Sequence, residues 1–149
     1  MKLHVVAPSA MVRSAVRATL RPLGWEGEHE AADLAGTLAL EDGASEIVLV
    51  AWAPPHLDAP EFTRALRENP EWSGSRVIVL GARRRAADVR RAIEAGASDY
   101  VLVPYEPTEL RARVKHWMQA GADAGDAGST AADEASDAEA DATPEAEAA

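Results

Sequence analysis

Two short runs of branched apolar residues constrain the fold of this chain more than any other feature. Residues 47–51 read Ile-Val-Leu-Val-Ala, and residues 76–80 read Arg-Val-Ile-Val-Leu. Continuous apolar runs of this length, rich in β-branched residues, are typical of central parallel strands that are covered on both faces. Parallel neighbours need a crossover connection, and Asp58 can cap a helix between the two runs whose inner face carries Phe62 and Leu66. The pair therefore predicts a sheet with helices packed against it.

Further strands and helices alternate with this pair along the chain. The expected strands are residues 3–7, 25–31 and 99–103, and the expected helices follow Ser9, occupy residues 32–42 and 86–95, and follow Glu106 and Pro107. Glu26, Glu28 and Glu30 alternate along 25–31, which suits an edge strand with one wet face. Leu34, Ala35 and Leu38 lie at helical spacing within residues 32–42. Five strand–helix repeats predict an α/β fold, a doubly wound five-stranded parallel sheet with helices on both faces.

The composition changes sharply after residue 120. Residues 121–149 contain no aromatic and no branched aliphatic side chain, so we expect a folded domain at 1–120 followed by a disordered acidic tail. The tail has no base and nine of the chain's 25 acids: Asp123, Asp126, Asp133, Glu134, Asp137, Glu139, Asp141, Glu145 and Glu147. Residues 1–120 contain the other 16 acids and all 15 bases, so the domain is nearly neutral. Most of the formal charge of -10 therefore comes from the tail.

The chain contains no cysteine, which excludes disulfides, thiolate metal sites and thiol catalysis. The apolar run after Met1 is too short for a secretion signal, and no apolar stretch approaches membrane-spanning length. We therefore expect a soluble, cytoplasmic protein with no membrane partner. Trp72 follows Pro70 in a polar loop and is a minor candidate for an exposed contact.

Two phrases of the sequence carry a resemblance to a known family. Residues 46–55 read Glu-Ile-Val-Leu-Val-Ala-Trp-Ala-Pro-Pro, and residues 94–110 read Glu-Ala-Gly-Ala-Ser-Asp-Tyr-Val-Leu-Val-Pro-Tyr-Glu-Pro-Thr-Glu-Leu. The second is highly specific, because it joins a Gly-Ala-Ser-Asp-Tyr strand to a Pro-aromatic turn. Across essentially all of residues 1–120 the chain resembles the response-regulator receiver family, to which chemotaxis regulators belong. The resemblance implies a flavodoxin-like strand order of 2-1-3-4-5 and a cis peptide before Pro104.

Receivers of this family transfer a phosphoryl group to their own aspartate, and the resemblance shows which positions should carry that chemistry. Two acids that hold Mg²⁺ are replaced by Ala7 and Pro8, and the nucleophilic aspartate is replaced by Ala51. Gly81 stands where a hydroxyl contacts the phosphoryl group, and Val103 stands where a lysine neutralises it. A methyl group cannot attack phosphorus, and Mg²⁺ needs hard oxygen ligands. We therefore predict a degenerate pseudo-receiver that is not an enzyme and has no catalytic residue, metal or cofactor.

Basic residues after the fourth strand and on the last helix mark a second candidate site. The resemblance implies that the fourth helix, fifth strand and fifth helix form the face where receivers meet partners or dimerise. The expected partner face comprises Arg90, Arg91, Tyr100, Tyr105, Arg111 and Lys115, and its alternative is a solvated helix face. Nucleic acid is not expected there, because no recognition helix or stacking platform is visible and the acidic tail would repel phosphates.

Two further groups of residues have competing interpretations. Tyr100 matches the family's switch aromatic, but Gly81 offers no hydroxyl to move it, so we expect one fixed rotamer. The glutamates of residues 25–31 could be imagined as metal ligands with His29. Because His29 points to the opposite face of a strand, we prefer a charged edge that resists aggregation.

The leading hypothesis is a phosphorylation-independent pseudo-receiver that regulates bacterial signalling by binding another protein, or a second copy of itself. The rival is a flavodoxin-like domain that binds a small ligand or cofactor at the strand ends. That rival needs a Gly-rich or Ser/Thr-rich phosphate loop, and residues 7–10 (Ala-Pro-Ser-Ala) make a poor one. A visible absorption spectrum would separate the two. The acidic tail either shields the basic face or only adds solubility.

Overall fold

A computed structural model of the chain describes residues 1–120, and the expected acidic tail lies outside these residues. Five parallel strands form one sheet in the order β2-β1-β3-β4-β5. They are β1 (Lys2–Val6), β2 (Gly27–Ala31), β3 (Ile47–Ala51), β4 (Arg76–Gly81) and β5 (Asp99–Leu102). The predicted fold class and strand order are confirmed, and the glutamate-rich strand lies at an edge of the sheet.

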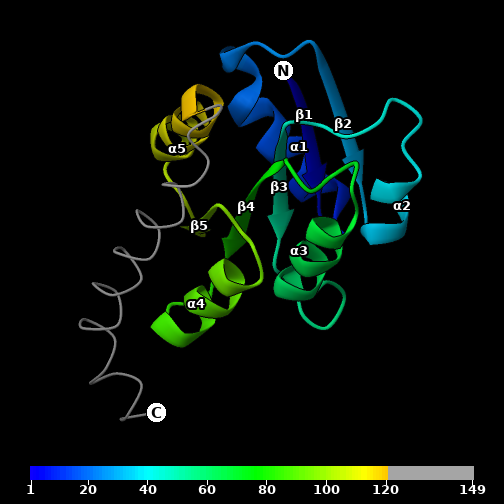
Figure 1. Cartoon of the computed structure of the whole chain (residues 1–149). Helices are drawn as coiled ribbons and strands as arrows, with labels where there is room; N and C mark the ends of the chain where they lie inside the picture. The colour runs from blue at the N-terminus through cyan, green and yellow to red at the C-terminus, as the bar shows by residue number, and fades with distance from the viewer. Residues whose placement is uncertain (121–149) are drawn as a thin grey trace.

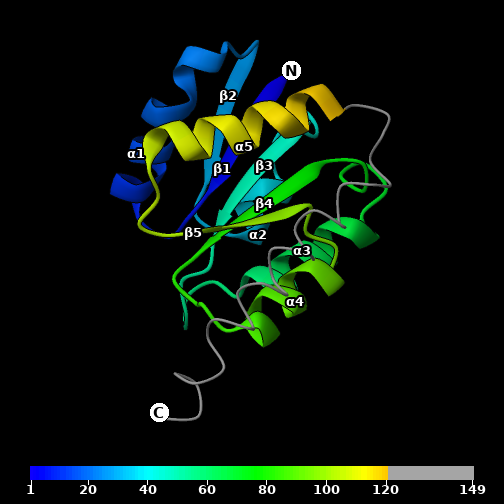
Figure 2. The same cartoon turned by 90° about the vertical axis from the view of Figure 1, so that its left-hand side faces the viewer.

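Helices cover both faces of this sheet (Figures 1 and 2). One face carries α1 (Ala10–Leu20) and α5 (Pro107–Ala120), and the other carries α2 (Leu34–Leu38), α3 (Ala59–Glu68) and α4 (Ala86–Glu94). A single 3-10 turn, η1 (Arg21–Leu23), follows α1. Ser9, Asp33 and Asp58 each accept a hydrogen bond from a main-chain amide in the first turn of α1, α2 and α3, which fixes where these helices begin. Within residues 1–120, no helix is long and apolar enough to span a bilayer.

The two central strands are buried on both sides. Ile47 and Leu49 of β3 face α1 and α5, whereas Val48 and Val50 face α3 and α4, and all four are fully buried. Because side chains alternate along a strand, covering both faces requires an apolar residue at every position. This requirement explains why residues 47–51 are continuously apolar.

The predicted helix at residues 32–42 was wrong in length. The observed helix α2 spans only Leu34–Leu38, and Leu38 is 42% exposed while Thr37 is fully buried. Thr37 faces inward because its Oγ1 lies 2.9 Å from Nε2 of His4, which is fully buried in β1. A buried imidazole needs a hydrogen-bonding partner, and this requirement sets the orientation of α2 against the hydrophobic spacing.

Trp72 is not an exposed contact, so that expectation was also wrong. The side chain is 1% exposed, and its ring centroid lies 5.6 Å from that of His4. The amide of Trp72 donates to the carbonyl of Asn69, so the chain turns back after α3 and brings the indole under the sheet.

Arg67 on α3 ties together several segments at the amino edge of the sheet. Its guanidinium donates to the carbonyls of Gly96 (2.8 Å), Ser73 (2.8 Å) and Ser75 (2.5 Å), and lies 3.4 Å from Oγ of Ser98. One side chain therefore joins the end of α3 to the segments that lead into β4 and β5.

A buried ion pair fixes α5 to β5. Asp99 is 3% exposed and accepts two hydrogen bonds from Nη1 of Arg113, at 2.6 and 2.7 Å. The indole of Trp117 and the amide of Tyr100 also donate to this carboxylate. These contacts satisfy a charge that would otherwise be costly to bury.

Candidate functional site

The parallel pairing brings the five replaced positions to the carboxyl edge of the sheet. Ala7 and Pro8 follow β1, Ala51 ends β3, Gly81 ends β4, and Val103 follows β5. Ala7 and Gly81 are buried, and Val103 packs on the apolar cluster beneath α1 and α5. No side chain of these five carries an oxygen or nitrogen atom. The expected cis peptide before Pro104 is present here, and a second cis peptide joins Pro54 to Pro55.

Tyr100 fills the space beside Gly81. Its side chain is 6% exposed, and its hydroxyl donates to the carbonyl of Arg83 at 2.9 Å. A Cβ placed on Gly81 would lie 2.3 Å from the Tyr100 oxygen and 2.9 Å from Cζ, far inside van der Waals contact. Burial raises the pKa of Tyr100 to about 12, so the phenol stays protonated and keeps its donor. Tyr100, expected on the partner face, is therefore an interior residue.

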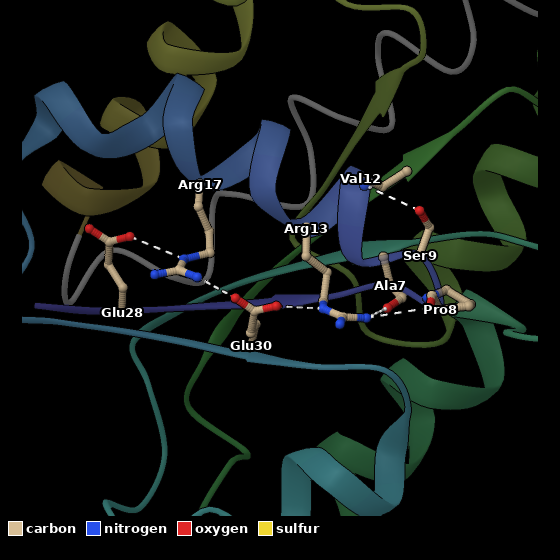
Figure 3. Close-up of polar contacts among 8 residues, drawn as sticks. All are labelled: Ala7, Pro8, Ser9, Val12, Arg13, Arg17, Glu28 and Glu30. Carbon is tan, nitrogen blue, oxygen red and sulfur yellow. Dashed lines mark hydrogen bonds and ion pairs between the residues drawn. The ribbon is translucent and has the colours of Figure 1, made fainter.

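A guanidinium lies beside the first of these positions, and sequence reasoning missed it. Arg13 of α1 donates to the carbonyl of Ala7 at 2.6 Å and lies 3.4 Å from that of Pro8 (Figure 3). Its Nε donates to Glu30 at 2.7 Å, so the side chain is held from both ends. Arg13 thus occupies the main-chain carbonyls that follow β1, while its charge is paired with Glu30.

Arg13 is the first member of a ladder of ion pairs between α1 and β2. Arg17 lies between Glu28 and Glu30 (Figure 3). Just after α1, Arg21 of η1 reaches Glu28 at 3.4 Å. The hydrogen bond from Arg13 is the main cause that holds the pKa of Glu30 below its usual value. The signal was present in the sequence, because arginines four residues apart share one helix face and alternate glutamates share one strand face.

The metal alternative for this strand finds no support within the described domain. Glu28 and Glu30 face the arginines of α1, while His29 on the opposite side lies 3.3 Å from Asp42. Glu26 pairs with the amino terminus at 3.3 Å. Among residues 1–120, no three histidines, aspartates or glutamates are grouped to hold a metal ion.

The residues of the expected partner face do not form one continuous surface. Arg91 and Lys115 are exposed on α4 and α5, and Arg90 is half-buried. Arg111 turns toward α1, where it lies 3.4 Å from the carbonyl of Thr19. Tyr105 packs on the apolar cluster beneath α1 and α5. Of these residues, Arg91 on α4 and Lys115 on α5 are the ones that stay exposed.

On the α4 side, Trp52 makes contacts that the sequence did not reveal. Trp52, just after β3, is nearly buried, and the guanidinium carbons of Arg83 and Arg91 lie 4.7 and 5.5 Å from the centre of its ring. Tyr100 meets the same indole edge-on, with ring centroids 6.4 Å apart. Asp88 lies 3.7 Å from Arg83 and 3.9 Å from Arg91. Such arginine–indole contacts are attractive, so the two guanidiniums are held over the ring.

An open cavity of about 290 Å³ lies between α2 and α3, beside the segments that follow β2 and β3. It is lined by Asp33, Leu34, His56, Leu57, Asp58, Glu61, Phe62 and Ala65. None of the five replaced positions contributes to its wall. The rival ligand-binding hypothesis, which places a ligand at the strand ends, therefore gains nothing from this cavity.

Known proteins similar to this chain share one family. The family model described as the response regulator receiver domain matches residues 4–115. The phosphate regulon transcriptional regulatory protein PhoB of Rhizobium meliloti is 29% identical over 118 residues, which cover 79% of this chain and 52% of PhoB. The chain thus spans about half the length of that relative. A CheY homologue of Campylobacter jejuni is 25% identical over 127 residues, covering 84% of this chain and 98% of the homologue.

Solved structures agree with these relatives. The BeF3-activated DrrB receiver domain superposes with a TM-score of 0.68 at 27% identity, and the match covers 79% of this chain and 97% of that domain. The chemotaxis response regulator CheY4 of Vibrio cholerae has the same fold, with a TM-score of 0.68 at 23% identity over 78% of this chain and 97% of CheY4.

Proposed function

The chain belongs to the response-regulator receiver family of bacterial two-component signalling, and we propose that it works without phosphorylation, by binding another protein. The observation that carries this proposal is the chemistry of the strand ends. No side chain at the five strand-end positions can act as a nucleophile, bind a metal ion or donate a hydrogen bond to a phosphoryl group. These positions are Ala7, Pro8, Ala51, Gly81 and Val103.

The surroundings of these positions support the same conclusion. Arg13 donates to the main-chain carbonyl of Ala7, so this oxygen already has a hydrogen-bond partner. The Tyr100 ring occupies the space that a side chain at position 81 would need. Restoring phosphoryl transfer would therefore require repacking around the site as well as new acids.

A protein is the partner class that the open surface supports. Arginine is enriched at protein interfaces, where its planar guanidinium forms paired hydrogen bonds with carboxylates. Arg83, Arg84 and Arg85 are exposed just before α4, Arg91 is exposed in its last turn, and Leu102 at the end of β5 is 36% exposed. We propose that this side of the domain receives the partner.

The proposal is tested by incubating the full chain with acetyl phosphate and Mg²⁺ and measuring the intact mass. We expect the mass to stay unchanged, while a receiver that keeps its aspartate and its two acids gains one phosphoryl group in the same buffer. A stoichiometric adduct that hydroxylamine removes would show that the chain is phosphorylated and would overturn the proposal.

Binding of a protein is tested separately by capture from native lysate. The full chain and an Arg84→Glu/Arg85→Glu variant serve as baits, and retained proteins are identified by mass spectrometry. We expect a protein that the wild-type chain retains and the charge-reversed variant loses. If the two baits retain the same set, the partner does not use this surface.

A further inference from the structure

Four arginines gather on the loop between β4 and α4 and on α4 itself. Arg83, Arg84 and Arg85 are consecutive and exposed, and Arg91 shares the Trp52 ring with Arg83. We call Arg83, Arg84, Arg85 and Arg91 the arginine surface. Within the described domain, Asp88 is the acid that faces it, and neither Arg84 nor Arg85 forms an ion pair with another residue there. The surface therefore carries an unbalanced positive charge.

The arginine surface is held in shape by the core beneath it. The Tyr100 hydroxyl donates to the main-chain carbonyl of Arg83 at 2.9 Å, which anchors the loop. Trp52 holds the guanidiniums of Arg83 and Arg91 from below. For these two guanidiniums, binding an anionic segment would cost little ordering, and preorganised guanidiniums bind carboxylates well.

The counter-charge is present in the same chain. Residues 1–120 are nearly neutral, whereas residues 121–149 hold nine acids and no base and begin directly after α5. A chain segment of this length has a root-mean-square reach of about 30 Å, which matches the width of a domain whose radius of gyration is about 14 Å. Its effective concentration at the domain surface is on the order of millimolar.

From these charges and this geometry we infer that residues 121–149 dock on the arginine surface of the same molecule. The contact consists of many weak ion pairs, so high salt screens these charges and releases the segment. An external acidic partner would have to displace the segment before it could bind, which makes the segment a competitive inhibitor built into the chain. The docking needs no external partner, so it can be tested whether or not the proposed function holds.

The absence of cysteine makes a direct test straightforward. A Ser136→Cys substitution gives the full chain one thiol within the acidic run, and a nitroxide spin label attached there broadens the NMR signals of nearby amides. At about 20 mM salt we expect broadening of residues 83–91 and of the Trp52 indole. At 1 M salt, where the Debye length is about 3 Å, this broadening should disappear. Amides of α1 and β2 should change little, because Arg13 and Arg17 of α1 are already paired with Glu28 and Glu30 of β2.

Matched variants of the full chain identify the cations that matter. Arg84→Gln/Arg85→Gln removes two exposed charges from the arginine surface and should at least halve the broadening at residues 83–91. Arg64→Gln/Lys115→Gln removes two exposed charges elsewhere and should leave it unchanged. Equal effects of both variants, or broadening confined to α5, would overturn the inference. So would broadening of an unlabelled ¹⁵N chain mixed with a spin-labelled ¹⁴N chain, because that contact would join two copies.

Discussion

The ring of Tyr100 occupies the space that any side chain at Gly81 would need, since a Cβ there would lie 2.3 Å from the phenol oxygen. The inward position of the Tyr100 ring thus depends on glycine at position 81. It links the end of β4 to the anchor of the arginine surface, because the same phenol holds the Arg83 carbonyl.

Gly81→Ala should therefore destabilise the domain and displace the Tyr100 ring. Overpacking a filled interior costs about 1–3 kcal/mol, and loss of the Tyr100 contact should change the fluorescence of Trp52. Urea unfolding and Trp emission measure both effects. Gly74→Ala is the control, because a Cβ there meets nothing within 4 Å. Adding Tyr100→Leu should recover part of the loss, and strictly additive costs would contradict the clash.

Ala51→Asp alone should not make the chain a substrate for acetyl phosphate. The new carboxylate would stand in a half-buried position with no metal ligand at Ala7 or Pro8, so its negative charge would lack a cation. We expect a stability loss of about 1–3 kcal/mol and no phosphoryl adduct. Ala51→Asn is the matched control, because it adds the same volume without charge. Efficient labelling of the aspartate variant would show that the remaining site is competent.

Asp99→Asn should be among the most destabilising polar substitutions in the domain. It leaves the Arg113 guanidinium without its bidentate partner, and breaking a buried pair costs about 3–5 kcal/mol. Asp88→Asn changes a longer pair with the exposed Arg91 and should cost about 1 kcal/mol or less. Urea unfolding at neutral pH measures the difference, and equal losses would mean that the buried pair contributes no more than the surface one.

The buried His4 should make the domain less stable in mild acid. Burial is the main cause that lowers the pKa of His4 from its ordinary 6.5 to about 4, with a contribution from nearby His29. In this range the unfolded chain binds a proton that the folded chain does not. Stability is therefore complete above pH 6.5 and falls as the pH drops toward 4, by about 2 kcal/mol at pH 5.

The contribution of His4 can be separated from that of other groups. Gln in its place can still hydrogen-bond to Thr37 but does not titrate between pH 5 and 7.5. Subtracting the unfolding free energies of His4→Gln from those of the wild type at each pH isolates the histidine. A difference that is flat from pH 7.5 to 5 would contradict the lowered pKa.

The sheet could be predicted because its pattern is local. The continuous apolar run at 47–51 indicates a strand covered on both faces, and helices cover both faces in the structure. The orientation of α2 and the burial of Trp72 could not be predicted in this way, because both depend on His4, which is distant in sequence and needs a polar partner and a packed ring.

The sequence pointed to five strand-end positions, which stay a prediction as a lost phosphorylation site, and it did not reveal the contacts around them. The five positions follow from the resemblance, and the sheet places them at one edge. The Arg13 contact with Ala7 and the Trp52 contact with Arg83 join segments that no short-range pattern connects. Arg111 was expected on the partner face, but its spacing on α5 did not reveal that it turns toward Thr19.

The hydrogen bonds of Arg67 bear on how the domain opens. One guanidinium holds main-chain carbonyls that precede both β4 and β5, so neither strand can separate from α3 without giving up a shared partner. Regions joined in this manner tend to open as one cooperative unit. Amide protons of β4 and β5 should then exchange with deuterated solvent at a common rate, whereas those of the edge strand β2, which this side chain does not reach, should exchange sooner.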